Sequence, residues 1–294
     1  MSVEKSKWQD AVVHLLALAT RLEGAGHYNL AKLCRATADS LSRRAAYQIE
    51  MASAQNDLAD LHRTIDALSR LDVAENLIAT FQRGVAAMAQ GRLALFNETP
   101  HAYVCRTCGH LTIGEPSGKC PTCGAWASTY QRFLPVYWLD ALEPFAALET
   151  LHQTPFQVET LLQGLSEDAL NQPARDGGWA IRNIVSHLRD AQGVISFRVD
   201  LFLQNEHPNL ESKAVFAWAT NENERPPSTR DVFETYKTSR AEMIGKFEKI
   251  PLAYWWRVGQ HEEFGPVTLK QQVSYFASYE LTHLPQLERL RAPR

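Results

Sequence analysis

Four cysteines in two closely spaced pairs are the residues whose types and spacing predict chemistry most directly. Each pair has the pattern Cys-x-x-Cys followed by glycine, and the four residues are Cys105, Cys108, Cys120 and Cys123. A two-residue spacer lets both thiolates of a pair reach one ion, and two pairs complete a tetrahedral shell of four sulfurs. Glycine after the second cysteine permits the backbone angles of a tight turn that points N–H groups at sulfur. The sequence therefore predicts a tetrathiolate metal site.

Two histidines of the C-terminal half lie on apolar helical stripes. His187 shares its stripe with Ile184, and His283 follows Phe276 and Tyr279, with Tyr279 one helical turn before it. A buried imidazole needs a partner for each ring nitrogen. Histidines on facing helices can share a metal, or each can hydrogen-bond a neighbouring carbonyl or tyrosine hydroxyl. The periodicity alone leaves both interpretations open.

Length and composition limit the classes of protein to consider. The chain has 294 residues, 45% of them apolar and 21% charged, which suits two or three globular domains. The net charge of −3 argues against a general binder of nucleic acid or anionic membranes. Only Cys34 remains outside the cysteine pairs, which suits a reducing compartment, and we expect this thiol to be buried and inert. No apolar run approaches a membrane span, so we expect a cytoplasmic protein.

The elements that must position these residues begin with an N-terminal helical region. Apolar residues recur at three- and four-residue steps, which predicts three helices within residues 2–98. The second is expected to be long, over about 30–68, and Asp72 is a candidate cap for the third. Di-iron bundles use Glu-x-x-His pairs, and no glutamate stands three residues before any histidine of this region: His14, His27 or His62. These helices are therefore expected to be packing elements.

The cysteine segment resembles the rubredoxin-like domain of rubrerythrins. The resemblance covers residues 101–134 and is carried by YVCRTCG from Tyr103, KCPTCGA from Lys119, and the aromatic residues Tyr130 and Phe133. It implies a tetrathiolate ion, iron or zinc, with iron serving electron transfer. The missing Glu-x-x-His pairs argue against the peroxidase activity of rubrerythrins. A zinc ribbon could also bind nucleic acid, but the basic residues here are too few to follow phosphates: Arg106, Lys119 and Arg132.

Four amphipathic segments after a proline-containing linker, residues 135–149, predict a four-helix bundle. They run to about residue 165, from Trp179 to Leu203, from a cap at Ser228 or Thr229 to residue 250, and over about 268–290. The stretch before the fourth helix, residues 252–268, is expected to form an irregular or hairpin-like lid. Within the fourth helix Pro285 lacks the N–H that would bond the Leu281 carbonyl, so a kink is expected beside His283.

Two short stretches of this half are similar to the signature segments of the DinB/YfiT-like superfamily. They are GGWAIRNIVSHLRDAQ at residues 177–192 and FASYELTHLPQL at residues 276–287. The resemblance implies a metal-binding four-helix bundle, often dimeric, in a family with thiol-dependent transferases and isomerases. Carried over, His187 and His283 match two of the three metal ligands, which would hold a divalent ion such as zinc or nickel. The third position holds Tyr279 where the family has histidine.

The tyrosine leaves three possibilities open. Phenolate binds divalent cations weakly unless its pKa, near 10, is strongly depressed. Tyr279 is therefore an unusual ligand, or another group completes the shell, or the site is degenerate. The lid offers three candidate substitutes: His261, Glu262 and Glu263. Gln286 is expected to support His283 through a hydrogen bond.

The sequence thus predicts an all-α protein with a small metal knuckle between two helical parts. Residues 1–100 form an N-terminal helical region, 101–134 a rubredoxin-like four-cysteine domain, and 135–294 a DinB-like bundle. The first functional hypothesis is a metal-dependent transferase or hydrolase, possibly thiol-dependent as in that family, with a small-molecule substrate and a homodimeric state. The alternatives are a rubredoxin-like electron carrier, and a non-catalytic protein that binds a ligand or partner and carries a structural zinc. Whether the chain is an enzyme is left open.

Overall fold

The computed structural model describes residues 2–50, 57–71, 73–175, 177–211 and 227–291. These divide into two compact units. The first comprises Met1–Ile78, Val104–Thr112 and Pro116–Gln131, and the second comprises Ala79–Tyr103, Ile113–Glu115 and Arg132–Arg294. The cysteine pairs belong to the first unit, and both bundle histidines belong to the second. The division into domains 1–100, 101–134 and 135–294 stays a prediction.

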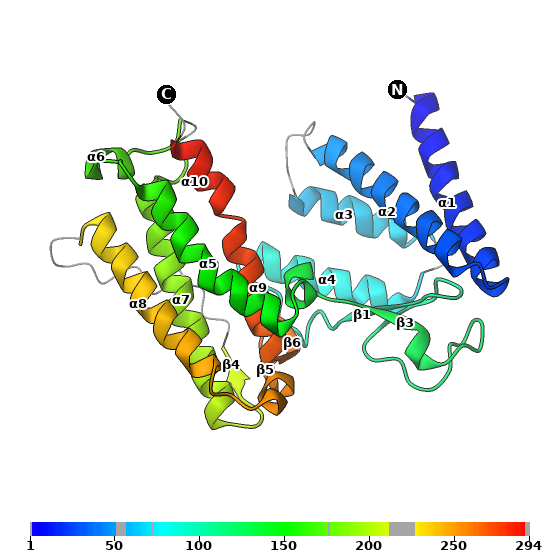
Figure 1. The fold of residues 1–294 in the computed structure, drawn as a ribbon. Helices are drawn as coiled ribbons and strands as arrows, with labels where there is room; N and C mark the ends of the chain where they lie inside the picture. The colour runs from blue at the N-terminus through cyan, green and yellow to red at the C-terminus, as the bar shows by residue number, and fades with distance from the viewer. Residues whose placement is uncertain (1, 51–56, 72, 176, 212–226, 292–294) are drawn as a thin grey trace. The chain divides into compact units, whose positions relative to one another are not determined.

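The first unit opens with a helical hairpin. Helices α1 (Ser2–Gly24) and α2 (Tyr28–Glu50) pack against each other (Figure 1), and buried alanines such as Ala19 and Ala31 let their backbones approach closely. Gly26 joins them with a φ of 84°, a conformation that glycine adopts without strain. Cys34, expected to be buried, is half-buried on α2.

Two further helices follow in the N-terminal region. They are α3 (Asp57–Leu68) and α4 (Glu75–Ala89). The single helix expected over 30–68 is represented in the described residues by α2 and α3, on either side of residues 51–56, which lie outside the described part. The expected cap residue of the next helix, Asp72, also lies outside it.

The cysteine segment contains a small sheet, so the all-α prediction needs correction. Strands β1 (Ala102–Cys105), β2 (Leu111–Ile113) and β3 (Tyr130–Phe133) are arranged in the order β2-β1-β3, with a 3₁₀ turn, η1 (Ala127–Thr129), before β3. The stretches before, between and after the cysteine turns are too short to complete a stable helix. They hold β-branched and aromatic residues, which fit extended backbone, and they pair with one another instead.

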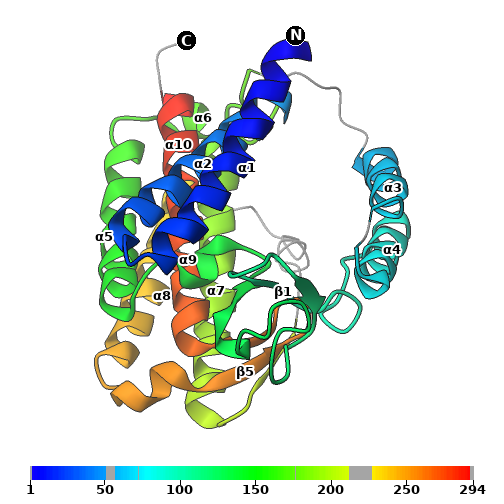
Figure 2. The ribbon, with the colours of Figure 1, turned by 90° about the vertical axis from the view of Figure 1, so that its right-hand side faces the viewer.

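A four-helix bundle forms most of the second unit, as the helical periodicity predicted (Figures 1 and 2). Its helices are α5 (Pro144–Leu162), α7 (Ile181–Gln204), α8 (Thr229–Phe247) and α9 (Leu269–Leu281), with a short α6 (Glu167–Leu170) between the first two. α5 and α7 each pack against both α8 and α9. A 3₁₀ turn, η2 (Tyr137–Asp140), lies against α9. Ser228 caps α8, one of the two residues expected there.

The expected kink beside His283 is present as a complete break. α9 ends at Leu281, and a separate helix, α10 (Leu284–Arg291), begins three residues later. In the intervening turn the His283 N–H donates to the Glu280 carbonyl at 3.0 Å. The cause is local, because Pro285 cannot donate to the Leu281 carbonyl. The break places His283 in a turn at the end of α9.

The stretch before α9 forms the expected hairpin. After a 3₁₀ turn, η4 (Leu252–Trp256), strands β5 (Val258–His261) and β6 (Gly265–Thr268) pair antiparallel. The sequence did not predict that β4 (Asn209–Leu210) joins β5 in parallel and completes a second three-stranded sheet. Gly265 has a φ of 74°, and a Cβ there would lie 2.5 Å from the Phe96 ring. Only glycine therefore fits at this position.

Apolar burial in the second unit is concentrated in two clusters. One, around Leu151, Val199 and Phe276, lies where the bundle meets the hairpin, and the other surrounds Val185 and Leu287. Both are built from the inward stripes that the periodicity predicted. Among the described residues, no helix is long and apolar enough to cross a membrane.

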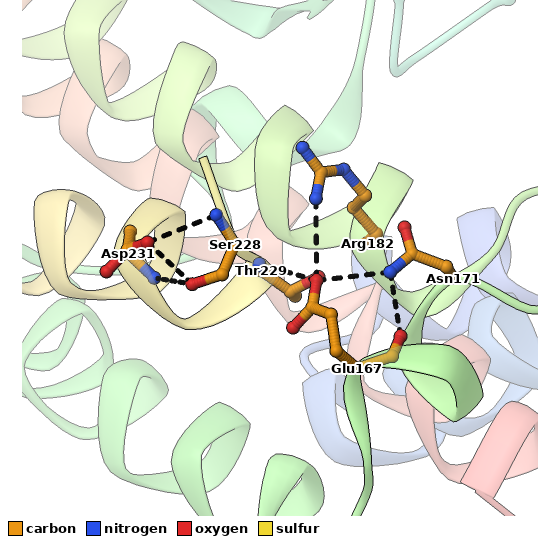
Figure 3. A network of polar contacts seen from close by, with 6 residues as sticks. All are labelled: Glu167, Asn171, Arg182, Ser228, Thr229 and Asp231. Carbon is orange, nitrogen blue, oxygen red and sulfur yellow. Dashed lines mark hydrogen bonds and ion pairs between the residues drawn. The ribbon is translucent and has the colours of Figure 1, made fainter. Parts of the chain in front are cut away.

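A polar network ties α6 to the start of α8 (Figure 3). The Glu167 carboxylate accepts hydrogen bonds from the Thr229 N–H at 2.8 Å and from its hydroxyl at 2.6 Å, and it lies 3.4 Å from Arg182 Nη1. Asn171 Nδ2 donates to it at 3.1 Å. Burial opposes ionisation, but these donors outweigh that effect and lower the pKa of Glu167 below its usual value of 4.5. The ionised carboxylate therefore binds one of the unpaired N–H groups at the α8 N-terminus.

Replacing Glu167 by alanine is expected to destabilise the bundle by about 1 kcal/mol, because a charge-assisted cap is lost. Since the native pKa is depressed, this contribution is present above pH 4.5 and is lost as pH falls through the lower native value. Urea unfolding at several pH values measures it. Glu149→Ala, on the exposed face of α5, is the matched control. Equal stability of both variants at pH 7 would contradict the capping role.

Candidate metal centres

The four cysteine sulfurs form a compact group. All lie within 4.8 Å of one another, with 3.8 Å between the sulfurs of Cys105 and Cys123 and 3.6 Å between those of Cys108 and Cys120. Zn–S bonds of about 2.3 Å in a tetrahedron place the sulfurs about 3.8 Å apart. The donor set and its spacing therefore fit a single tetrahedral ion.

The backbone around each pair makes the same turn twice. The Gly109 N–H donates to the Cys105 carbonyl and the Gly124 N–H to the Cys120 carbonyl, both at 2.9 Å, with glycine φ angles of 81° and 75°. Backbone N–H groups donate to all four sulfurs, from these residues: Thr107, Cys108, His110, Thr122, Cys123 and Ala125. Such donors stabilise thiolate over thiol, which is the form that binds metal.

The bundle brings the three other predicted ligands together. His187 comes from α7, Tyr279 from the last turn of α9, and His283 from the turn that follows. The ring centroids are 5.0 Å apart for the two histidines, 5.7 Å for His187 and Tyr279, and 5.0 Å for Tyr279 and His283. The packing of α7 against α9 creates this cluster. The two histidines alone, His187 and His283, form the imidazole pair.

Hydrogen bonds indicate which ring nitrogens can bind a cation. His283 Nδ1 lies 2.9 Å from Gln286 Oε1, and because an amide oxygen only accepts, Nδ1 carries the proton. His283 Nε2 then has a free lone pair, and this buried atom has no hydrogen-bond partner within the described part of the chain. His187 Nε2 lies 2.9 Å from the Tyr279 hydroxyl. Gln286 thus orients His283 as expected, and leaves its Nε2 ready to act as a ligand.

Burial shifts the pKa of two groups in the cluster. Burial, together with the nearby His283, lowers the pKa of His187 to about 4. Burial raises the pKa of Tyr279 above its usual value of 10. At neutral pH His187 is therefore a neutral imidazole, which fits a divalent ion, and Tyr279 keeps its proton, so its phenol is a poor third ligand.

Aromatic residues that the sequence analysis did not assign to the site surround the cluster. The Trp179 ring lies 5.2 Å from His187, Trp138 lies 5.3 Å from Tyr279, and Tyr275 stacks on Tyr279 at 5.9 Å with an interplanar angle of 2°. Trp179 is itself 44% exposed, so the aromatic surroundings cover the cluster only in part. Tyr275 could have been found from its position one turn before Tyr279. Trp138 had no such signal, because it comes from the segment before the bundle.

The three lid residues do not complete the site. His261 Nδ1 accepts the N–H groups of Glu263 at 3.1 Å and Phe264 at 3.2 Å, so its ring closes the β5–β6 turn. Burial and the charge of Arg198 lower its pKa to about 3. Within the described residues, no third His, Cys, Asp or Glu side chain lies close enough to share an ion with both His187 and His283. His261, Glu262 and Glu263 are therefore not substitute ligands in this structure.

Comparisons with known proteins found matches to the bundle part of the chain. Residues 150–287 match the model of the DinB superfamily. Among curated relatives, "Putative metal-dependent hydrolase" of Geobacillus thermodenitrificans is 31% identical over 86 residues, which are 29% of this chain and 47% of the relative. "Putative metal-dependent hydrolase YfiT" of Bacillus subtilis is 29% identical over 72 residues, 24% of this chain and 40% of the relative. The alignments thus span less than half of these relatives' length.

A solved structure was also found. It is YfiT from Bacillus subtilis, described by its authors as "a probable metal-dependent hydrolase with an unusual four-helix bundle topology". It covers 51% of this chain and 89% of its own, with 18% identity and a TM-score of 0.45. The family match identifies residues 150–287, which contain both members of the imidazole pair, as a DinB superfamily domain.

Proposed function

We propose that the chain is a metal-dependent enzyme, a hydrolase or transferase, whose centre is the imidazole pair of His187 and His283. The observation that carries this proposal is the buried Nε2 of His283, which has no hydrogen-bond partner among the described residues. The His283 ring lies 5.0 Å, centroid to centroid, from the imidazole of His187. A buried polar atom without a partner is costly unless something absent from the protein satisfies it. The names of the curated relatives support a metal ion as that partner.

The residues of the cluster would have different roles in such a centre. A divalent ion, zinc or nickel, bound by the two imidazoles would supply Lewis acidity and lower the pKa of a bound water or thiol. Gln286 holds the His283 ring in the tautomer that exposes Nε2. The Tyr279 hydroxyl hydrogen-bonds His187 Nε2 in the absence of an ion, and it could donate to a substrate oxygen once His187 turns to the ion. The rings of Trp138 and Tyr275 pack against Tyr279.

The tetrathiolate group is proposed to hold zinc or iron in a structural role, in a rubredoxin-like knuckle. Its two inner sulfurs, Cys105 and Cys120, are buried, and the sheet around them is very small. A small-molecule substrate and a homodimeric state are proposed from the family resemblance. Purified protein should be colourless with zinc and red with iron in this site.

One observation favours a second candidate function, a non-catalytic protein with a degenerate bundle site. The Tyr279 hydroxyl already satisfies His187 Nε2 at 2.9 Å, so this imidazole does not need an ion. In that case the bundle would bind a ligand or partner, and the chain would carry a single metal ion.

Metal analysis of a His283→Ala variant separates the two candidates. Protein purified without nickel resin should contain two metal equivalents, and the variant should contain one, because an imidazole ligand is lost while the sulfurs are intact. His152→Ala, an exposed histidine of α5, is the control and should keep both. Loss of both equivalents, or of neither, would refute a metal site at the imidazole pair.

A further inference from the structure

A second polar group lies further along the same two helices. Arg198 of α7 is only 7% exposed, although its guanidinium stays charged at any physiological pH. Its Nη1 donates to Gln272 Oε1 of α9 at 3.1 Å, and its Nη2 donates to the Glu211 carbonyl at 3.0 Å. Buried charges of this kind are costly and are found where they have several partners or a function.

Two buried N–H donors, those of Gln272 and Trp138, have no acceptor among the described residues. Gln272 is fully buried, and its Nε2 has no acceptor among the described residues. The same is true of the Trp138 Nε1, whose ring lies against Tyr275 and Tyr279 at 5.9 and 5.3 Å. Each unmet buried donor costs about 1–3 kcal/mol. An oxygen-bearing ligand or an ordered water is therefore expected to accept from them.

The donors and the imidazole pair lie on one continuous face. Gln272, Tyr275, Tyr279 and His283 follow one another at three- and four-residue steps, so they share one side of α9 and the turn after it. On α7, Arg198 comes eleven residues, or three turns, after His187, about 16 Å along the axis. Long helical side chains lean toward the N-terminus, which brings the guanidinium closer to the imidazoles. Tyr275 and Trp138 occupy the interval.

The positive charge of Arg198 interacts with the carboxylate of Glu263 on the hairpin. Burial lowers the pKa of Arg198, while Tyr275 and the carboxylate of Glu263 act in the opposite direction. Burial, with Tyr279 next, raises the pKa of Tyr275 to about 12, so its hydroxyl is neutral and can donate. A buried guanidinium and the unpartnered amide N–H₂ of Gln272, which the Arg198–Gln272 hydrogen bond places side by side, together favour a ligand that presents carboxylate oxygens.

We propose that Arg198 and Gln272 bind a carboxylate of the substrate, while the reacting end of the same molecule lies at the imidazole pair. This rests on the proposed function, because it assigns a substrate class to that centre. The substrate is then an elongated organic acid, with its carboxylate on the order of 10–16 Å from the reacting group. Its aliphatic or unsaturated middle would lie along Tyr275 and Trp138.

Calorimetric titration of zinc-loaded protein with linear dicarboxylates, from succinate to dodecanedioate, tests the proposal. One length should bind best, because its two ends match the two sites. Arg198→Met should weaken that binding roughly tenfold or more, the loss expected for a charged hydrogen bond. Gln272→Glu should abolish it, because the new carboxylate would pair with Arg198. Arg189→Met, at a half-buried arginine of α7 paired with Asp190, is the control and should bind normally.

The carboxylate site at Arg198 and the metal site at the imidazole pair can be tested separately. Octanoate, which has one carboxylate, should still bind the His283→Ala variant, because Arg198 is unchanged, even if that variant shows that no metal is bound by the bundle. If Arg198→Met does not fold in a thermal melt, Arg198→Lys replaces it and should weaken binding less. Equal binding to wild type and the Arg198 variant, or no binding of any acid, would overturn the proposal.

Discussion

Replacing Cys105 by serine should abolish metal binding at the tetrathiolate group and unfold the cysteine segment. This sulfur is 1% exposed and lies 3.8 Å from that of Cys123. Structural zinc sites contribute about 10–16 kcal/mol in small zinc-binding peptides, which is as large as the whole stability of a typical domain. A sheet of three strands, each of three or four residues, buries too little apolar surface to replace that contribution.

Metal analysis combined with hydrogen exchange measures this effect. Amides of β1, β2 and β3 should lose protection in Cys105→Ser, and chelation of the wild-type protein should have the same result. Amides in the centres of α7 and α8 should keep theirs, since their core is separate. Cys34→Ser is the matched control and should retain the metal. A Cys105→Ser protein with its full metal content and normal exchange would show that these sulfurs hold no structural ion.

The second large effect is expected at Arg240, the side chain that connects all four bundle helices. Arg240 of α8 is 1% exposed and donates to Gln192 Oε1 of α7, to the Leu151 carbonyl of α5 at 2.7 Å, and to the Glu280 carboxylate of α9. Tyr236 donates to the same carboxylate at 3.2 Å. Every partner of the guanidinium is itself buried or part of a helix backbone.

Arg240→Met should destabilise the second unit by about 3–5 kcal/mol, because Glu280 would become a buried charge without its counter-ion. The double variant Arg240→Met/Glu280→Leu should recover most of this loss, since no charge is then buried alone. Denaturant unfolding of the two variants gives the comparison. Lys237→Met, which removes a more exposed pair on the same helix, should cost less than about 1 kcal/mol. A single variant no less stable than the double would contradict the role of the ion pair.

The hydrogen-bond network of Arg240 is connected to the imidazole pair through Glu280. The Glu280 carbonyl accepts the His283 N–H at 3.0 Å, so the carboxylate that Arg240 holds belongs to the residue that anchors the turn of His283. Loss of Arg240 should therefore also weaken any metal bound by the bundle. The His283→Ala protein offers the reciprocal comparison, because it removes the imidazole while the ion pair of Arg240 and Glu280 is intact.

Features that depend on near neighbours in the chain were predicted well. The break at Pro285, the cap at Ser228 and the hairpin over 252–268 each follow from local backbone chemistry, and the structure confirms them. The Cys-x-x-Cys pairs predicted that the four sulfurs would meet, and the structure places all four within 4.8 Å of one another. The fold is dominated by helices as predicted, but the all-α prediction missed two small sheets, because very short strands carry too few residues to show a periodic pattern.

The two Cys-x-x-Cys turns, the apolar faces of the bundle helices and the inward orientation of His187 and His283 could be predicted from residue types and spacing. The contacts between polar groups of different helices could not: the hydrogen bond of Tyr279 to His187, the pairing of Arg240 with Glu280, and the approach of Arg198 to Gln272. Periodicity records which side of a helix avoids water, whereas contacts between helices depend on their crossing and register. Those are set by the packing of the whole core, and no local segment of the chain encodes them.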